Sequence, residues 1–324
     1  MNRAILVRKP GGPSALKWER VDTPDPKTGE ILLKTTAVGL NFIDTYHRKG
    51  LYPLPTPFIP GVESVGLISK LGRGVTGFKI GDRVACVSEP MGAYAEYRVF
   101  PAARLVRIPR DITDHTAASM MLKGLTAAML AKRVYRVKSG DMVLIHAAAG
   151  GVGLILSQWA KSLGATVIGT VGSAAKARLA KDYGVDHVIN YNKQNFVNVV
   201  ARLTKNKKLP VVFDSVGAAT FPGSLDCLMP MGLWVTYGNA SGPVAPLAPL
   251  TLMQKGSLFM TRPMLNHYIS DPIEYKKLAG ELFSIVRKGG VKVEINQIYD
   301  LKDAQKAHTD LEARKTTGST LLIP

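Results

Sequence analysis

The pattern of apolar and polar positions changes part of the way along the chain. In residues 1–123, short apolar runs are separated by Pro- and Gly-rich turn signals, and glycines recur closely between Gly61 and Gly81. Such punctuation is typical of short strands joined by tight turns. The pattern predicts a β-rich, barrel-like domain over 1–123, with strands near 4–7, 30–38, 62–71, 83–86 and 96–100.

From about residue 140, strand and helix patterns alternate. Continuous apolar runs predict strands at 142–147, 166–171, 187–191, 210–214, 233–237 and 258–261. Amphipathic spacing predicts helices at 152–163, 174–183 and 196–203. Because wholly apolar strands are typical of a parallel sheet buried on both faces, the fold class is α/β, with a Rossmann-type doubly wound sheet.

The tail of the chain has a weaker pattern. It predicts a helix near 272–288, a strand near 291–295 and a short helix near 302–313. We therefore expect two domains, a nucleotide-binding domain over 124–264 and a β-rich domain over 1–123 that residues 265–324 complete.

One glycine-rich segment lies where a strand pattern gives way to a helix pattern. It reads HAAAGGVG at 146–153, with Ala148 where the dinucleotide fingerprint has its first glycine. Gly150 permits close approach of a pyrophosphate, Gly153 permits close packing of the helix, and the helix N-terminus offers N–H groups. We expect Gly150, Gly151 and Val152 to contact a dinucleotide; a structural turn without a ligand is the alternative.

The distribution of acidic residues bears on which cofactor binds. NAD sites usually place an acid about 20 residues after the first glycine, but no acid lies between Asp141 and Asp182. Lys176 and Arg178 lie nearby instead, which favours NADPH, although both could simply be solvated on a helix face. The candidates for the adenosine end are Gly172, Ser173, Lys176 and Tyr191.

Small and polar residues follow two later strands, in the segments 214–217 and 237–241. Ligands of open α/β sheets bind at the carboxyl ends of strands. We therefore expect the nicotinamide end near Ser215, Val216, Gly238, Asn239 and Ser241; ordinary turns are the alternative.

Composition narrows the classes of protein. Hydrophobic residues make up 46% of the 324 residues, and the two cysteines form no Cys-x-x-Cys pair. Polar residues, glycines or prolines interrupt the uncharged stretches 142–160 and 227–254, so we expect no membrane span. Without a visible signal peptide or disulfide pattern, the expected location is cytoplasmic.

The net charge is +18, from 42 basic and 24 acidic residues. Such a charge attracts anions of many kinds. An RNA-binding protein with an idle nucleotide fold is therefore one hypothesis. It is weakened because the densest basic tract is short, at 205–208, and no RNP-like aromatic motif is present.

Four segments together resemble a known family. They read NFIDTY at 41–46, GVE at 61–63, KGLT at 123–126 and GSTLLIP at 318–324. With the domain order, they resemble the medium-chain dehydrogenase/reductase superfamily, and within it the zeta-crystallin-like NADPH:quinone oxidoreductases. The resemblance implies a GroES-like barrel beside the Rossmann domain and a homodimer paired through the strand at 258–261.

The resemblance also implies metal-free chemistry. Zinc alcohol dehydrogenases have a cysteine where Asn41 stands and a histidine where Val62 stands, and only Glu63 of their Gly-His-Glu motif remains. A lone carboxylate is no zinc site. The expected activity is NADPH-dependent reduction of a quinone in the interdomain cleft; reduction of enones or enals is the alternative.

Further site residues follow from the resemblance alone. Asn41, Tyr46 and Tyr52 would line the cleft and donate hydrogen bonds to a quinone carbonyl, Asn41 and Tyr46 contacting the cofactor as well. Leu125 and Thr126 would flank the nicotinamide, and Arg262 and Arg314 match cofactor-contacting positions. The alternatives are loop anchors for the tyrosines, an Asx-turn for Asn41 and surface charge for the arginines.

Overall fold

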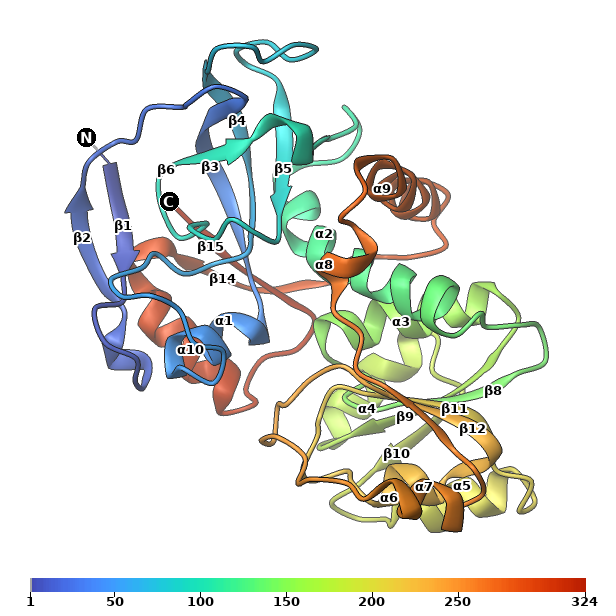
Figure 1. Ribbon diagram of the computed structural model, residues 1–324. Coiled ribbons are helices and arrows are strands. Elements are labelled where there is room, and N and C mark those ends of the chain that lie inside the picture. The colour runs from blue at the N-terminus through green and yellow to red at the C-terminus, as the bar shows by residue number, and fades with distance from the viewer. Residues whose placement is uncertain (1) are drawn as a thin grey trace. The chain divides into compact units, whose positions relative to one another are not determined.

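A computed structural model describes residues 2–324 and divides them into two compact units. The first unit contains the chain up to Lys123 together with Ile269–Phe283 and Val293–Pro324. The second contains Gly124–Tyr268 and Ser284–Lys292. Figure 1 traces the elements of both in chain order.

The first unit is built on a seven-stranded sheet in the order β14-β15-β3-β4-β5-β7, with β6 paired to β3. Its strands pair antiparallel, except that β14 and β15 run parallel. A separate hairpin joins β1 and β2. The strands are β1 (Asn2–Leu6), β2 (Lys17–Val21), β3 (Glu30–Leu40), β4 (Glu63–Leu71), β5 (Arg83–Val87), β6 (Tyr97–Pro101), β7 (Leu105–Arg107), β14 (Ile295–Asp300) and β15 (Ser319–Ile323).

The helical elements of this part of the chain are α1 (Phe42–Lys49), α2 (Asp114–Met129), α9 (Pro272–Arg287), α10 (Ala304–Glu312) and the short turns η1 (Pro13–Ala15), η2 (Ala102–Arg104) and η4 (Leu301–Asp303). The sequence pattern predicted only strands and turns before residue 123, so it missed α1 and the start of α2. In α1 the buried residues include Asp44 and Arg48, which hides the apolar period. The strand expected at 291–295 is also wrong, because β14 begins at Ile295.

The second unit is a six-stranded parallel sheet in the order β10-β9-β8-β11-β12-β13. The strand order reverses between β8 and β11, which makes the gap between their carboxyl ends the switch point where such sheets bind ligands. The strands are β8 (Met142–Ile145), β9 (Thr166–Val171), β10 (His187–Asn190), β11 (Leu209–Asp214), β12 (Leu228–Thr236) and β13 (Phe259–Thr261).

The strands are connected by α3 (Gly151–Ser162), α4 (Ala174–Asp182), α5 (Phe196–Leu203), α6 (Gly223–Asp226) and α7 (Pro249–Gln254); η3 (Leu130–Val134) precedes β8 and α8 (Leu265–Tyr268) follows β13. The sheet core includes Leu144, Ile168, Val212 and Trp234. Fully apolar strands therefore lie between covering helices, as their sequence predicts. The expected fold class, a doubly wound parallel sheet together with a β-rich unit, is confirmed.

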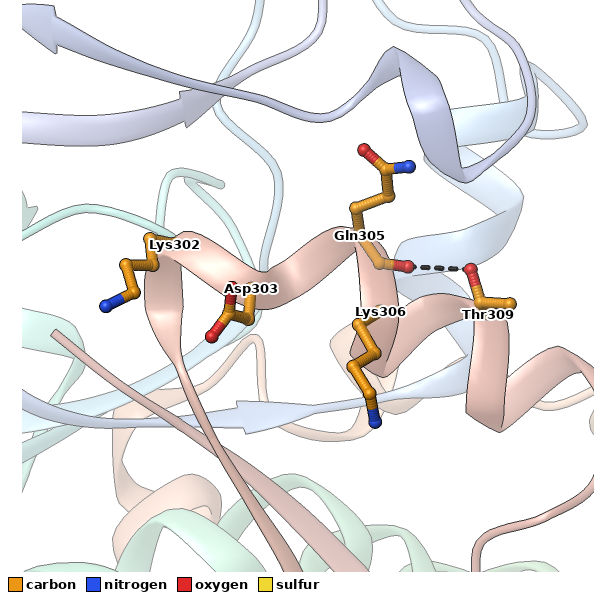
Figure 2. A pocket seen from close by; sticks show the side chains of 5 residues that line it. All are labelled: Lys302, Asp303, Gln305, Lys306 and Thr309. Carbon is orange, nitrogen blue, oxygen red and sulfur yellow. Dashed lines mark hydrogen bonds between the residues drawn. The ribbon is translucent and has the colours of Figure 1, made fainter.

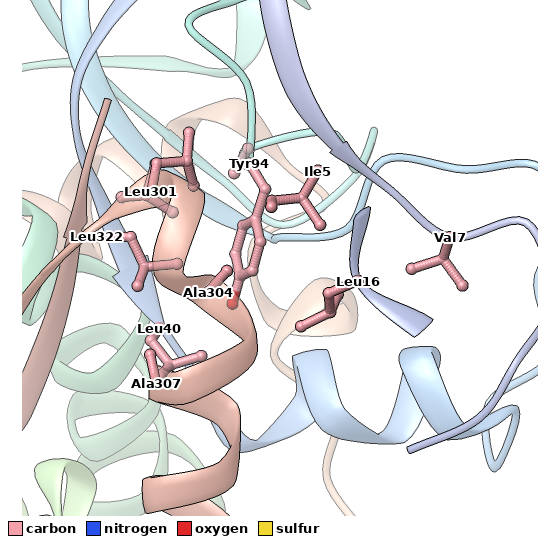
Figure 3. Packing of buried hydrophobic residues seen from close by; sticks show 11 residues of the cluster. Ile5, Val7, Leu16, Leu40, Tyr94, Leu301, Ala304, Ala307 and Leu322 are labelled. Carbon is pink, nitrogen blue, oxygen red and sulfur yellow. The ribbon is translucent and has the colours of Figure 1, made fainter. Parts of the chain in front are cut away.

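The core of the first unit joins distant parts of the chain. Figure 3 shows the ring of Tyr94 between Ile5 and Leu301, beside Ala304 of α10. The C-terminal segment is thus packed on the N-terminal strands by buried apolar contacts, each large side chain contributing about 1.5–3 kcal/mol. Among residues 2–324, no helix combines the length and the apolar character that a membrane crossing requires.

Candidate functional site

The glycine-rich turn after β8 presents the N-terminus of α3. Its N-cap is Gly150, which provides no side-chain cap, and no acid lies in the first turn. The first backbone bond of the helix runs from Leu154 N to Gly150 O, at 2.9 Å. The amides before Leu154 have no intrahelical acceptor, so this end offers N–H groups and a positive dipole to an anion.

The backbone around this turn explains which residues it tolerates. A Cβ on Gly153 would lie 2.4 Å from the oxygen of Ala147, so the helix packs directly on the turn only because residue 153 is glycine. Ala148 occupies the position of the first fingerprint glycine. It is accommodated by Gly169 on the neighbouring strand, where a Cβ would lie 2.7 Å from the Ala148 Cβ.

A buried carboxylate supports the next turn, after β11. Asp214 accepts hydrogen bonds from Val216 N at 2.8 Å and Gly217 N at 3.2 Å. The hydroxyls of Thr220 and Ser224 also donate to it, at 2.8 Å or slightly more. Burial acts to raise the pKa of Asp214, but nearby His146 and these donors hold that pKa below its ordinary value.

His146 connects that carboxylate to the glycine-rich turn. Its Nε2 lies 3.1 Å from Ser224 Oγ, and its Nδ1 lies 2.9 Å from Thr170 Oγ1. Because Ser224 donates to Asp214, the imidazole donates to Ser224 from Nε2 and accepts at Nδ1. Burial lowers the pKa of His146, consistent with a neutral ring. The sequence analysis did not predict this hydrogen-bonded network. The only feature that could have indicated it is that polar residues such as His146 and Asp214 stand at the ends of otherwise apolar strands.

The residues expected at the adenosine end come together at the carboxyl ends of β9 and β10. A Cβ on Gly172 would lie 2.4 Å from the Tyr191 hydroxyl, so the phenol lies directly over this glycine. Ser173 caps α4 by accepting from Lys176 N at 3.2 Å. The structure therefore brings Gly172, Ser173, Lys176 and Tyr191 into one cluster.

The residues expected at the nicotinamide end also meet. A Cβ on Gly238 would lie 2.3 Å from Ser215 O. Ser241 donates to Val216 O through both its backbone N, at 2.9 Å, and its hydroxyl, at 2.8 Å. Arg262, directly after β13, donates to Gly238 O at 3.0 Å, and its other terminal nitrogen lies 3.1 Å from the Asn239 amide oxygen once that amide is oriented to satisfy both groups.

In the first unit, Asn41 is held on three sides. Its side-chain nitrogen donates to Gly39 O at 3.0 Å and to Glu63 Oε2 at 2.8 Å. Its backbone N–H donates to Asp44 Oδ2 at 3.0 Å. The expectation that this amide donates to a quinone carbonyl is wrong, because both of its hydrogens are already bound; Oδ1 is the atom that it can offer.

Glu63, the residue retained from the zinc-dehydrogenase motif, is engaged by protein donors. The carboxylate is fully buried, accepts from Leu122 N at 2.7 Å and lies 3.4 Å from Lys123 Nζ. A Cβ on Gly39 would lie 2.1 Å from Glu63 Oε2, so this glycine makes room for the carboxylate. Across residues 2–324, no three His, Cys, Asp or Glu side chains gather in a way that could hold a metal ion.

The two predicted tyrosines lie together, Tyr46 within α1 and Tyr52 shortly after its end. The ring centroids of Tyr46 and Tyr52 are 5.4 Å apart, edge to face, and that of Phe42 lies 5.8 Å from that of Tyr46. His47 contacts Tyr52, and burial lowers the pKa of this histidine to about 4. This packing fits both the substrate-orienting role and the loop-anchor role.

The remaining predicted residues are placed as follows. Leu125 is fully buried and Thr126 is half-buried, both within α2 and assigned to the second unit. Arg314 follows α10 in the first unit, with a left-handed φ of 58°. The structure thus gathers one set of predicted residues on the second unit and another set on the first.

A separate hollow of about 330 Å³ lies on the surface around η4 and α10. Figure 2 shows the side chains that line it, Lys302, Asp303, Gln305, Lys306 and Thr309. None of the predicted site residues contributes to it.

Two family descriptions match the chain. "Alcohol dehydrogenase GroES-like domain" matches residues 27–110, and "Zinc-binding dehydrogenase" matches residues 151–295. The first corresponds to the β-rich unit and the second to the unit with the parallel sheet.

Full-length relatives are more specific. A quinone oxidoreductase of Pseudomonas aeruginosa is 48% identical, with 100% of both chains covered. A 2-haloacrylate reductase of Burkholderia sp is 43% identical over 100% of this chain and 99% of its own. The crystal structure of an Escherichia coli quinone oxidoreductase complexed with NADPH matches with a TM-score of 0.98 and 46% identity over 100% of both chains. The chain therefore belongs to the quinone oxidoreductase family of the medium-chain dehydrogenases/reductases.

Proposed function

We propose that this protein binds NADPH and uses it to reduce quinones. The observation that carries the proposal is the set of glycine-rich and polar turns at the carboxyl edge of the parallel sheet, placed around an α3 N-terminus without a side-chain cap. Support comes from the 46% identity, over the full length, to an enzyme whose structure is complexed with NADPH.

The residues present fit a dinucleotide. Gly172 lets the Tyr191 phenol, and Gly238 lets the Ser215 backbone, approach so closely that an added Cβ would clash, so both turns lie near their neighbours at the edge of the sheet. Gly150, Gly151 and Val152 would hold the pyrophosphate at the helix N-terminus. Gly172, Ser173, Lys176 and Tyr191 would hold the adenosine end, and Ser215, Val216, Gly238, Asn239, Ser241 and Arg262 the nicotinamide end.

Lys176 favours the phosphorylated cofactor. The turn after β9 carries no carboxylate that would repel a 2′-phosphate, and Lys176 belongs to the first turn of the helix that follows. A charge-assisted contact to a phosphate is worth about 1.5–3 kcal/mol. We therefore assign the preference for NADPH to Lys176 together with the helix N-terminus.

NADPH supplies a hydride when bound, and the protein orients the acceptor. Asn41 Oδ1 would accept from an N–H or O–H of the cofactor, because a quinone has no hydrogen to donate, and Tyr46 and Tyr52 would present aromatic faces suited to a flat quinone. Leu125 and Thr126 would flank the nicotinamide, and Arg314 would contribute a cofactor contact. No metal is needed in this proposal, because Asn41 and Val62 provide an amide and an aliphatic side chain where a zinc site would need thiolate and imidazole.

A homodimer is part of the proposal. β13 is the edge of the parallel sheet, and its Phe259 and Met260 are 61% and 47% exposed. Met231, Met253 and Leu250 are also exposed in this part of the chain. An uncovered apolar edge invites aggregation unless it is paired, and a second copy would cover it by a two-fold contact.

A cytoplasmic location fits the two cysteines. Cys86 and Cys227 are both unpaired and buried, as expected for a protein of a reducing compartment. Burial raises the pKa of each thiol to about 12, which keeps both in the unreactive thiol form.

Reduction of activated alkenes is the second candidate, favoured by the 43% identity to a 2-haloacrylate reductase. A substrate panel decides between the two. NADPH oxidation should be followed with benzoquinones, naphthoquinones, enones and 2-haloacrylates, each with and without a chelator. Quinone turnover unaffected by chelator supports the proposal; turnover of alkenes alone favours the second candidate, and zinc-restorable loss contradicts the metal-free account.

A further inference from the structure

Four buried polar side chains form a continuous chain through the first unit. Tyr94 Oη lies 2.9 Å from Asp44 Oδ2 and 2.9 Å from His308 Nε2. Arg48 Nη1 lies 3.1 Å from His308 Nδ1. All four residues are buried at 0% exposure. They come from α1, from the segment before β6 and from α10, so the fold has assembled them from distant parts of the sequence.

The chemistry of the groups fixes the direction of these hydrogen bonds. An arginine can only donate, so His308 accepts at Nδ1 and carries its proton on Nε2. The Nε2–H then donates to the Tyr94 oxygen, and the phenol donates to the Asp44 carboxylate. Burial, aided by the charge of Arg48, lowers the pKa of His308 to about 3, which keeps the ring neutral.

The carboxylate end of the chain reaches Asn41. Asp44 Oδ2 accepts from Asn41 N at 3.0 Å as well as from Tyr94. The arginine end is anchored in turn, because Arg48 Nη2 donates to Glu312 at 2.8 Å and Arg48 Nε donates to Gly11 O at 3.1 Å. Figure 3 shows the Tyr94 ring that connects the two ends, fixed among Ile5, Leu301 and Ala304.

We propose that the Arg48–His308–Tyr94–Asp44 chain is the positioning element for Asn41, holding it by presenting an ionised carboxylate to its backbone N–H. The inference deepens the proposed function and rests on it. The chain is no path for protons, because the guanidinium at its end does not release one. Its action is to orient Asp44 and to stabilise the carboxylate by a directed hydrogen bond.

The surroundings of Asp44 make this support depend on pH. Burial raises the pKa of Asp44 to about 7, while the Asn41 and Tyr94 donors and Lys123 act to lower it, and Glu63 acts to raise it. Protonation leaves a neutral acceptor, whose hydrogen bond to Asn41 is weaker. The other charged or titratable groups on α1 and α10 are His47, Arg48, Lys49, Lys306, His308, Asp310 and Glu312. Burial lowers the pKa of both histidines. Burial acts to raise the pKa of Glu312, but Lys49 and Arg48 hold it below its ordinary value, so neither histidine nor Glu312 titrates near pH 7.

The first test compares two phenol-to-carboxylate hydrogen bonds of the same length. Tyr94→Phe removes the bond to Asp44, and Tyr299→Phe removes the 2.9 Å bond to Asp310 in the same unit. For Tyr94→Phe, kcat/KM for the quinone should fall about three- to thirtyfold at neutral pH. The acidic limb of the pH profile of kcat/KM should also move to higher pH in this variant, because Asp44 loses a donor that stabilises its ionised form. Tyr299→Phe should match the wild type in both readouts.

A second pair of variants tests the histidine. His308→Gln retains one acceptor and one donor, so it should keep both the turnover and the position of the limb. His308→Leu retains neither, so the phenol loses the donor that directs it; the limb should move in the same direction as in Tyr94→Phe but by a smaller amount, because Tyr94 still donates to Asp44. Circular dichroism would show whether Tyr94→Phe folds. If it does not, the two His308 variants still test the inference. A limb that stays in place in both Tyr94→Phe and His308→Leu overturns the inference.

A measurement without cofactor or substrate separates this inference from the proposed function. In ¹⁵N-histidine spectra of the full chain, with His308→Gln used to assign the signal, His308 should remain neutral with its proton on Nε2 between about pH 5 and 8. A proton on Nδ1, or titration in this range, would overturn the inference. If the wild type reduces no quinone, the proposed function fails, and this spectrum still decides whether the directed chain exists.

Discussion

The side-chain amide of Asn41 donates a 2.8 Å hydrogen bond to the fully buried carboxylate of Glu63. Lys123 balances the charge of that carboxylate, and Asp44 holds the backbone of the same asparagine. Two buried carboxylates therefore fix this asparagine, Glu63 through its side-chain nitrogen and Asp44 through its backbone N–H. Glu63 accepts from Asn41, Leu122 and Lys123, and Asp44 Oδ2 accepts from Asn41 N and Tyr94, which offsets part of the cost of burying these carboxylates and preorganises the site.

Glu63→Gln should lower the stability of the protein. The change leaves the Lys123 ammonium buried without its carboxylate, which costs about 3–5 kcal/mol when a buried pair loses one partner. Urea unfolding should show this loss. Asp25→Asn breaks an exposed pair with Lys70 and should change the unfolding free energy by about 1 kcal/mol or less. Equal effects of the two substitutions would contradict the structural role given to Glu63.

Lys176→Ala should reduce the preference for NADPH over NADH about 10- to 100-fold, since it removes a contact worth about 1.5–3 kcal/mol. The ratio of kcat/KM for the two cofactors measures it. Lys181→Ala, in the last turn of the same helix, removes an equal charge far from the turn after β9 and serves as the control. A ratio that stays at the wild-type value in Lys176→Ala would return this lysine to a solvated helix face.

Gly238→Ala should weaken cofactor binding at least tenfold. Its Cβ would come within 2.3 Å of Ser215 O, so the turn after β12 must move. Gly280→Ala, in α9, has no neighbour within 4 Å and should raise stability by about 0.5–1 kcal/mol without affecting binding. Titration of NADPH fluorescence measures the first effect and thermal unfolding the second; unchanged NADPH affinity in Gly238→Ala would place the cofactor elsewhere.

Asp44 should make the protein less stable as the pH rises. Its folded-state pKa is raised to about 7 by burial, above the unfolded value of about 3.9. The folded state therefore holds the proton more tightly, and this contribution is present at low pH and lost between about pH 4 and 7. Asp44→Asn should remove that part of the pH dependence. The urea midpoint of the wild type should fall relative to that of Asp44→Asn from pH 5 to pH 8. A constant difference between the two midpoints would argue against a buried, titrating Asp44.

Phe259→Lys should convert the proposed dimer to monomer. The side chain is 61% exposed on the edge strand β13, and a charge there would be buried by a second copy. Light scattering at micromolar concentration measures the mass. Ile273→Lys, which replaces a 75% exposed side chain at the start of α9, is the control and should leave the mass unchanged. A wild-type monomer would end the proposal.

The second unit was predictable because its signals are local. Apolar runs such as the one that forms β8 identify buried strands without help from distant residues, and the glycines at 150–153 follow β8 directly. Turns at the ends of successive parallel strands must then share one edge of the sheet. That topology alone brings Gly172 near Tyr191, and Ser215 near Gly238.

The supporting groups of the first unit were not predictable, because their contacts are long-range. Tyr94 lies 50 residues from Asp44 and 214 from His308, and His308 lies 260 residues from Arg48. The helix α1 is only eight residues long and its buried residues include the polar Asp44 and Arg48, so the sequence pattern did not reveal it. For the same reason the donor role expected of Asn41 was wrong: nothing local shows that Glu63, 22 residues later, accepts its hydrogen.

The central claim is that the chain is an NADPH-dependent quinone reductase, and steady-state oxidation of NADPH in the presence of a benzoquinone tests it most directly. The purified protein should consume NADPH in proportion to enzyme and quinone concentration, with kcat/KM at least tenfold higher than with NADH and with no change on adding chelator. No quinone-dependent oxidation of NADPH, across benzo- and naphthoquinones at neutral pH, would contradict the account.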